Sequence, residues 1–178
     1  CLFILSFIYS ATINIPENYP TIQEGIDAAT TGDTIFVSTG TYSPETGEYF
    51  PIIMISNINL IGEDEETTIL DAQQTGSVIA MDNCENNTIS DLTITGGAGT
   101  NGGGMLLLGS NPLLKNITIT NNTSSSDGAG MYLYDSNPSL NHITISHNAT
   151  NHNGGGMYIR SSNPTLIHVT ISHNMSDE

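Results

Sequence analysis

The side chains best suited to binding a ligand are aromatic and basic residues that recur at a fixed step. Tyr132 and Tyr158 are 26 residues apart, and Tyr134 and Arg160 repeat that step two residues further on. Residues two apart in a strand point to the same face, so these four would form one outward stripe, with Asp135 beside it. Aromatic rings on a flat sheet can stack on sugar faces. We therefore predict a carbohydrate-binding stripe; the alternative is that tyrosine simply suits the surface of a strand.

Histidines also repeat at 26 residues, as His142 with His168 and His147 with His173. On adjacent strands about 5 Å apart such pairs could bind a metal, but no cysteine or carboxylate completes the set. We interpret them as turn residues at the surface. The acidic run 63–66 is interpreted as a solvated loop, with calcium binding as the alternative. The sequence predicts no metal site and no cofactor, and it leaves calcium open.

A third stripe consists of hydroxyl residues at alternate positions of the repeat. Its members are Thr93, Thr95, Thr118, Thr120, Thr144, Ser146, Thr170 and Ser172. Regular outward threonine pairs on a flat β-helix resemble the ice-binding faces of some antifreeze proteins. Serine at two of the four final positions weakens that interpretation. The alternative is that threonine is a common exposed residue of strands.

The tyrosine stripe, the histidine pairs and the threonine stripe all belong to one repeat, and the repeat must form the elements that position them. Gly104-Met105, Gly130-Met131 and Gly156-Met157 keep the step of 26 residues, as do the Asn-Pro pairs. Each unit holds short strand-forming runs separated by Gly, Asn, Pro or Ser, without a helical period. A unit of this length with three short strands is one coil of a parallel β-helix. We predict an all-β, right-handed parallel β-helix, a solenoid of about 26 residues per coil.

The repeat also predicts what lies inside each coil. Alternation along the strand places Ile117 and Ile119 inside and the residues between them outside. Asn122, Asn148 and Asn174 are in register at one corner. We predict that they form a structural ladder of amide side chains, which satisfies buried backbone groups of the turn.

The segment before the regular repeats is predicted to cap the solenoid. Residues 21–24 (Thr-Ile-Gln-Glu) are a capping box, which predicts a short helix over 21–29 that closes the first coil. A turn is predicted at Gly40-Thr41-Tyr42, and strands at 34–37, 57–61, 67–70, 77–81 and 87–95. The predicted organisation is an N-terminal cap, 12–33, followed by a parallel β-helix, 34–178, that is incomplete at the C-terminus.

The first residues match a secretory signal. Residues 2–9 are an apolar run, and Ser10 and Ala11 are small residues suited to cleavage, so 1–11 is predicted to be the remnant of a signal peptide. The chain is therefore expected to be a fragment of a secreted or cell-surface protein. With Cys1 removed, Cys84 has no partner, and a buried thiol is expected.

The charge limits the partners. The chain has 18 acidic and 2 basic residues, for a net charge of -16. Such a surface repels nucleic acid and anionic membranes. We expect a polysaccharide or cell-surface glycan as partner, no nucleic acid, no membrane insertion of the mature domain, and a monomer.

Several segments resemble a known superfamily. Residues 19–29 (Tyr-Pro-Thr-Ile-Gln-Glu-Gly-Ile-Asp-Ala-Ala), 32–37 (Gly-Asp-Thr-Ile-Phe-Val), 40–42 (Gly-Thr-Tyr) and 60–62 (Leu-Ile-Gly) are similar to the opening of the pectin lyase-like superfamily, which pectinesterases share. The later coils resemble the right-handed β-helix repeats of surface proteins and autotransporter-like passengers. The resemblance covers about residues 15–174, and it implies the fold more than an activity, because function depends on sites grafted onto folds.

The catalytic sets of those enzymes are not matched. The two Asp contexts of pectinesterases are absent, and so are the Gly-His-Gly and Arg-Ile-Lys of polygalacturonases. A lyase would need an Arg or Lys base, and the candidates Lys115 and Arg160 occupy different repeat positions. The remaining acid pair is Asp135 with Asp82 as its counterpart two coils away, roughly 10 Å apart, against the about 6.5–9.5 Å of inverting hydrolysis.

We therefore predict no catalytic residues in this chain. The predicted function is a secreted or cell-surface module that binds carbohydrate or serves in adhesion or structural display. One alternative is a polysaccharide-degrading enzyme, of pectate lyase, polygalacturonase or pectinesterase type, whose active-site coils are missing or diverged. A second alternative is an ice-binding threonine face.

Overall fold

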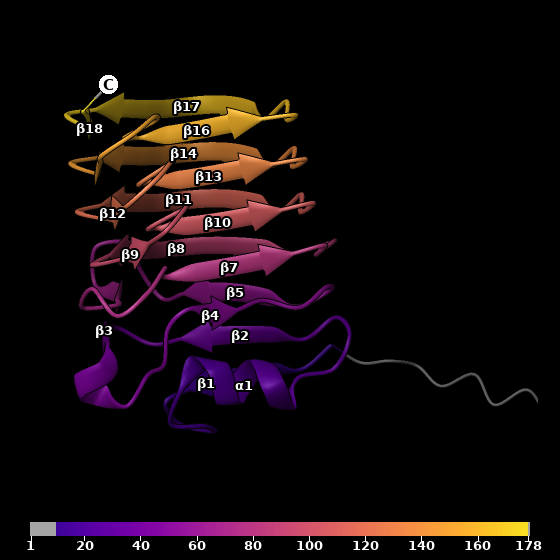
Figure 1. The fold of residues 1–178 in the computed structure, drawn as a ribbon. Coiled ribbons are helices and arrows are strands. Elements are labelled where there is room, and N and C mark those ends of the chain that lie inside the picture. The colour runs from indigo at the N-terminus through magenta and orange to yellow at the C-terminus, as the bar shows by residue number, and fades with distance from the viewer. Residues whose placement is uncertain (1–9, 178) are drawn as a thin grey trace, which may run out of the picture.

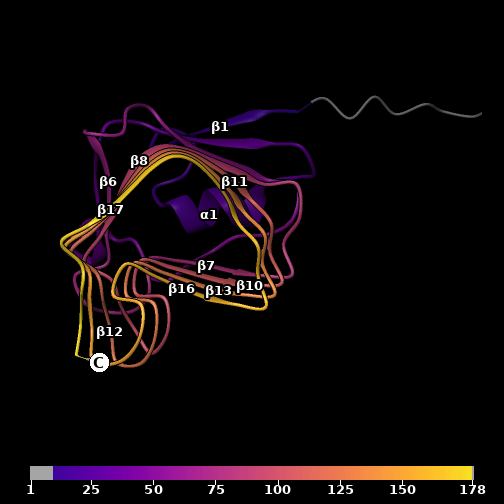
Figure 2. The same ribbon diagram turned by 90° about the horizontal axis from the view of Figure 1, so that it is seen from above.

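The repeat folds into stacked coils whose strands pair only with the coils before and after them (Figure 1). The computed structural model describes residues 10–177, so most of the predicted signal remnant lies outside the described residues. Viewed along its axis, the chain advances as a right-handed parallel β-helix of about 26 residues per coil (Figure 2). The predicted fold class is therefore confirmed.

Within residues 10–177, three parallel sheets form the walls of the solenoid. Sheet A has nine strands: β1 (Thr12–Ile15), β2 (Thr34–Val37), β3 (Gly40–Tyr42), β5 (Asn59–Gly62), β6 (Thr68–Asp71), β8 (Thr88–Thr95), β11 (Leu113–Thr120), β14 (Ser139–Ser146) and β17 (Thr165–Ser172). Sheet B has five: β4 (Ile52–Ile53), β7 (Ile79–Asp82), β10 (Met105–Leu108), β13 (Met131–Tyr134) and β16 (Met157–Arg160). Sheet C has four: β9 (Ala98–Gly99), β12 (Thr123–Ser124), β15 (Ala149–Thr150) and β18 (Met175–Ser176).

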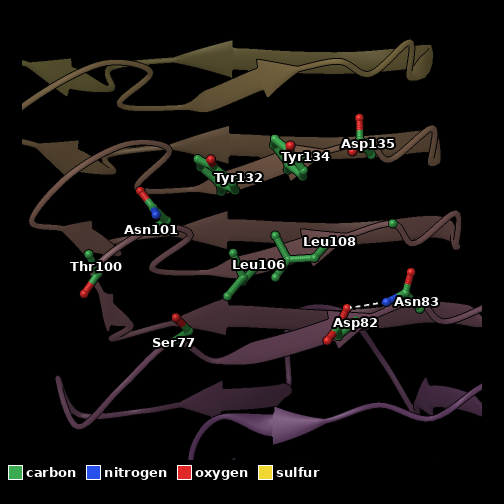
Figure 3. Close-up of a pocket in the computed structure, with 11 residues that line it drawn as sticks. Ser77, Asp82, Asn83, Thr100, Asn101, Leu106, Leu108, Tyr132, Tyr134 and Asp135 are labelled. Atoms are coloured by element: carbon green, nitrogen blue, oxygen red, sulfur yellow. Dashed lines mark hydrogen bonds between the residues drawn. The ribbon is translucent and has the colours of Figure 1, made fainter.

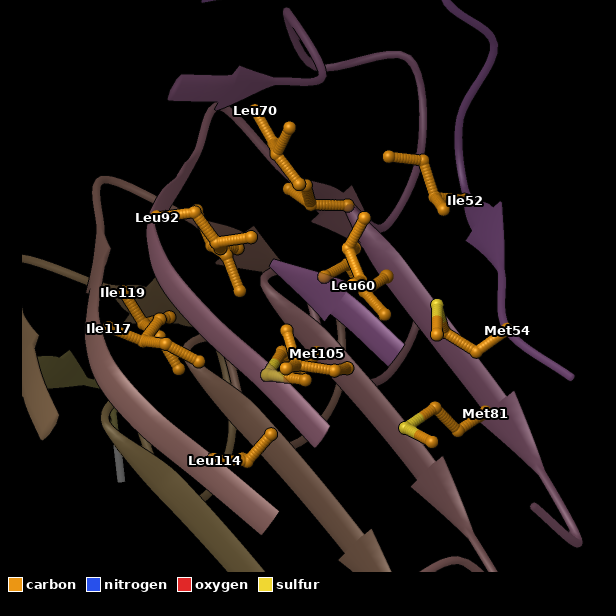
Figure 4. Packing of buried hydrophobic residues seen from close by; sticks show 14 of the residues in the cluster. Ile52, Met54, Leu60, Leu70, Met81, Leu92, Met105, Leu114, Ile117 and Ile119 are labelled. Carbon is orange, nitrogen blue, oxygen red and sulfur yellow. The ribbon is translucent and has the colours of Figure 1, made fainter. Parts of the chain in front are cut away.

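Like residues stack on like residues in the core, as the alternation predicts. Met105 pairs with Met131 across β10 and β13, and Ile117 pairs with Ile143 across β11 and β14. Ile117, Ile119 and both methionines are fully buried or nearly so, and they form part of one continuous apolar cluster (Figure 4). Because each coil buries its neighbour's apolar ladder, the core is continuous along the solenoid axis.

Residues in the left-handed backbone region make the corners of the coil. After sheet B the corner is Asn83, Gly109, Asp135 and Ser161, with φ between 49° and 56°. Asn, Asp and Gly are the residues that adopt this conformation most readily, which explains the composition of the corner. Asp82 pairs with Leu108, and Leu108 with Tyr134. The prediction that Asp82 is the counterpart of Asp135 is therefore wrong by one residue.

The predicted asparagine ladder is present. The backbone N–H of Asn122 donates to Oδ1 of Asn148 at 3.0 Å, and that of Asn148 donates to Oδ1 of Asn174 at 2.9 Å. Nδ2 of Asn148 donates to the carbonyl of Ile119 at 3.0 Å. Asn122 and Asn148 are fully buried, so these amides satisfy turn backbone that water does not reach.

A short helix closes the N-terminal end. Helix α1 (Ile22–Ala28) lies across the end of the coil outline, with Ile22 and Ile26 fully buried (Figure 2). Its predicted N-cap is confirmed, because the side chain of Thr21 accepts a hydrogen bond from the backbone N–H of Glu24 at 3.2 Å. The carboxylate of Glu48 accepts further bonds from the first turn, at 2.6 Å from Ile22 N.

Two buried carboxyl groups hold this N-terminal region. Burial raises the pKa of Glu48, and the hydrogen bonds from helix α1 only partly oppose that effect. The pKa of Asp33 is lowered, first by the backbone N–H of Ala11 and then by that of Thr30.

Cys84 is a buried free thiol, as predicted, and burial raises its pKa.

One prediction is corrected near the start of the solenoid. Gly40-Thr41-Tyr42 is strand β3 rather than a turn, because it lies beside β6 and pairs with Thr68–Leu70. The acidic run 63–66 is a loop in which Glu63, Asp64 and Glu66 are exposed, as predicted, whereas Glu65 is half-buried. The hydroxyl of Thr118 donates to Oε1 of Glu65 at 2.6 Å, and that of Thr93 donates to the carbonyl of Glu65 at 2.8 Å.

In the described part of the chain no helix is long and apolar enough to cross a membrane.

Candidate functional site

A groove of about 720 Å³ lies on the outer face of sheet B (Figure 3). Strands β7, β10 and β13 form its floor, and the loop after β9 stands at one side. The corner residues that follow the strands stand at the other side. The lining residues are Ser77, Asp82, Asn83, Thr100, Asn101, Leu106, Leu108, Gly109, Tyr132, Tyr134 and Asp135.

The groove follows from a step in side-chain size along two outward columns of sheet B. One column runs Ala80, Leu106, Tyr132 and Tyr158, and the other runs Asp82, Leu108, Tyr134 and Arg160. Tyr132 and Tyr134 line the groove together with residues of earlier coils, whereas Tyr158 and Arg160 do not line it. The two tyrosines therefore overhang the shorter Leu106 and Leu108.

The later coil supports this overhang. The rings of Tyr132 and Tyr158 are stacked, with centroids 5.2 Å apart and planes 13° from parallel. The guanidinium of Arg160 lies 5.3 Å from the centroid of the Tyr134 ring, a cation–π contact. The five predicted carbohydrate-binding residues thus divide into two groups. Tyr132, Tyr134 and Asp135 line the groove, and Tyr158 and Arg160 cover the opposite ring faces.

Tyr132 is the most enclosed of the lining side chains that carry an aromatic ring. It points outward, as predicted, yet it is only 9% exposed, against 36% for Tyr134. Its hydroxyl makes no hydrogen bond with any described residue. A flat, freely exposed stacking platform is therefore not what the stripe forms. It forms the edge of a recess, where the Tyr132 hydroxyl stays accessible to water.

Polar groups surround the recess. Asp82 accepts a hydrogen bond from Nδ2 of Asn83 at 2.7 Å, and both side chains are exposed. Asn101 is held in the loop, where its Oδ1 accepts from the backbone N–H of Asp127 at 3.1 Å. Among the described residues no basic side chain lines the groove. The groove therefore combines an apolar floor with a neutral and acidic rim.

Sequence reasoning missed the residues that come from outside the regular strands. Ser77, Thr100 and Asn101 reach the groove from turns, and the periodicity gives no signal for where a turn leans. Leu106 and Leu108 stand one 26-residue step before Tyr132 and Tyr134, so the repeat itself predicts that they belong to the same outward stripe, and the register confirms it.

The groove does not present an arrangement typical of glycoside hydrolysis. Asp82 and Asp135 both line it, but both are exposed, and their coils are roughly 10 Å apart, at the upper limit of the about 6.5–9.5 Å of an inverting pair. Lys115 lies in β11 of sheet A and Arg160 in β16 of sheet B, so the two bases are not brought together.

The other stripes lie on sheet A. His142 and His168 have ring centroids 4.6 Å apart, and His147 and His173 are stacked at 5.2 Å. All four are exposed and have positive φ, but only His147 and His173 lie in the turns that follow strands β14 and β17, as predicted. His142 and His168 lie within those strands, so the prediction of turn residues is wrong for them. The described residues include no group of three or more His, Cys, Asp or Glu side chains that could hold a metal. The threonine stripe is in register, but its first coils bond to Glu65 rather than facing solvent as a clear plane.

Comparison with known proteins gives one match. A family model described as "Protein of unknown function (DUF1565)" matches residues 11–176. No curated protein matches the chain. No solved structure matches it either.

Proposed function

Because the chain belongs to the DUF1565 family of proteins of unknown function, its role must be argued from its own surfaces, and we propose that it is a secreted or cell-surface β-helix module that binds polysaccharide in the groove of sheet B. In this role the solenoid serves as a rigid support that displays the groove. We also propose, from the opening segment, that the chain is related to the pectin lyase-like superfamily.

The observation that carries the proposal is the recess beneath Tyr132 and Tyr134. Sugar rings have apolar faces and hydroxyl edges, so a site that holds them combines aromatic or aliphatic surface with well-placed polar groups. Leu106 and Leu108 supply the apolar floor, and the tyrosines supply the overhang. The amide of Asn101, beside Ser77 and Thr100 at one side of the groove, can exchange hydrogen bonds with sugar hydroxyls.

Charge supports a ligand that is not an anion. The two basic residues are Lys115, on sheet A, and Arg160, whose guanidinium lies on the Tyr134 ring outside the groove. Nothing among the lining residues would neutralise a uronate or a phosphate. Polyanionic sugars and nucleic acids are therefore disfavoured by the field of the whole chain.

A groove-filling variant tests the proposal. Leu106→Tyr with Leu108→Tyr copies the next coil, where Tyr132 and Tyr134 occupy the same register, so the variant is expected to fold. Wild type is applied to an array of neutral polysaccharides, and binding to any positive member should be lost in the variant. Tyr49→Ala, at an 80% exposed tyrosine outside the groove, is the matched control and should bind as wild type.

Two results would contradict the proposal. In the first, wild type binds no polysaccharide on the array. In the second, the groove-filled variant binds as tightly as wild type while circular dichroism shows both to be folded.

A further inference from the structure

The charge and hydrogen-bonding groups of the groove specify its ligand more closely. We propose that the groove selects amino-sugar oligosaccharides with free, protonated amino groups over their neutral N-acetylated forms. This inference rests on the proposed function, since it names the class of carbohydrate that the same groove takes.

The first step is the hydroxyl of Tyr132, which is available to a ligand in the groove. The side chain is nine-tenths buried, lines the groove, and has no hydrogen-bond partner among the described residues. The hydroxyl oxygen is not among the buried polar atoms that lack a partner, so it is open to water. A hydroxyl or amino group of a ligand in the groove would supply a partner.

The second step is the pair of carboxylates. Asp82 accepts one hydrogen bond, from Asn83, and no cationic side chain of the described residues pairs with either Asp82 or Asp135. Arg160 is turned to the opposite face of the Tyr134 ring. The negative potential of the groove is therefore uncompensated, and a ligand cation would be attracted into it.

The third step is where the cation would sit. The face of Tyr134 that looks toward Leu108 borders the groove, and its other face already carries the guanidinium of Arg160. A protonated amine below the ring would meet the same attraction to the aromatic quadrupole. Asp82 and Asp135 lie roughly two coil spacings apart, about 10 Å along the solenoid axis, so one extended oligosaccharide can present separate amines to both.

The test compares two tetrasaccharides by isothermal titration calorimetry, one of glucosamine and one of N-acetylglucosamine. The measurement is made at mildly acidic pH, where the amines of the glucosamine tetramer are protonated. Two exposed ion pairs should make the glucosamine tetramer bind about 2- to 30-fold more tightly, and added salt should reduce that preference.

Three variants locate the effect. Asp82→Asn with Asp135→Asn should abolish the preference for the glucosamine tetramer, because it removes both carboxylates of the groove. Glu17→Gln with Glu45→Gln removes the same charge at exposed sites outside the groove and should keep the preference. Tyr132→Phe should weaken both tetramers by about 2- to 10-fold, the range for one net hydrogen bond.

The possible outcomes separate this inference from the proposed function. Equal binding of the two tetramers, or a preference that the Glu17 and Glu45 variant loses as fully as the aspartate variant, overturns the inference and leaves a neutral-sugar groove. If neither tetramer binds and the polysaccharide array is also negative, both ideas fail. A preference that depends on Asp82 and Asp135 alone supports both.

Discussion

Asn148 is the residue whose replacement most directly tests how the coils are held together. It is fully buried and its Oδ1 accepts from the backbone N–H and from the Nδ2 of Asn122, each at 3.0 Å. Its Nδ2 donates to the carbonyl of Ile119 at 3.0 Å and to Oδ1 of Asn174 at 2.9 Å. Asn148→Ala therefore removes the side-chain partner of one backbone donor and one backbone acceptor in the interior.

The expected loss follows from those two backbone groups. Each buried group left without a partner costs about 1–3 kcal/mol, so the free energy of unfolding should fall by about 2–6 kcal/mol. Asn148→Asp keeps the shape and the acceptor but replaces the amide donor with a carboxylate that faces the carbonyl of Ile119. It should be at least as destabilised at neutral pH, because that carboxylate is buried without a cation.

Asn137→Ala is the matched control from the same coil. Asn137 is exposed, and its Oδ1 accepts from the backbone N–H of Asn163 at 2.6 Å, which water can replace. The expected loss is about 0.5–1 kcal/mol. Both variants are measured by urea unfolding followed by far-ultraviolet circular dichroism. If both variants lost the same free energy of unfolding, the argument that burial makes the amide ladder important for stability would be refuted.

Three further predictions concern the cap and the close contacts between coils. The pKa of Asp33 is lowered, so its contribution to stability should be present above its ordinary pKa of 3.8 and should be lost as pH falls below that value. Asp33→Asn should therefore reduce the loss of stability at acidic pH, as measured by urea unfolding at a series of pH values. The pKa of Glu48 is raised by burial, so wild-type stability should increase as pH falls from neutral toward 4.5, and an unchanged gain in Glu48→Gln would contradict the assignment. A Cβ at Gly130 would lie 2.3 Å from the carbonyl oxygen of Gly156, so Gly130→Ala should lower the melting temperature and reduce the free energy of unfolding by about 1–3 kcal/mol. Gly76→Ala is the control and should be nearly neutral, because the nearest atom to a Cβ there is 3.4 Å away.

Periodicity predicted the solenoid because its cause is local. A step of 26 residues sets the coil length, and alternation within each short strand sets which side chains face inward. The burial of Ile117 and Ile119 and the ladder at Asn148 follow from these two rules alone. Thr21 as an N-cap is equally local, since a capping box lies within one turn of helix.

Non-local pairing accounts for the misplaced elements. Gly40-Thr41-Tyr42 has the composition of a turn, but β6 lies beside it and supplies a strand partner. Asp82 and Asp135 are 53 residues apart in the numbering rather than twice 26, and only the register shows that Asp135 belongs to the corner and not to the strand.

The sequence by itself determined the length of the coil, which side chains point into the core, and the outward stripe that contains Tyr132 and Tyr134. The tertiary structure decided that the stripe borders a recess and that the Tyr132 side chain is largely buried, because both depend on how much space neighbouring side chains leave. Stacking on Tyr158 covers one face of Tyr132, and the shorter Leu106 leaves room at the other. The turn that carries Asn101 leans over that space, and no pattern in one coil specifies where a turn of the previous coil will lie.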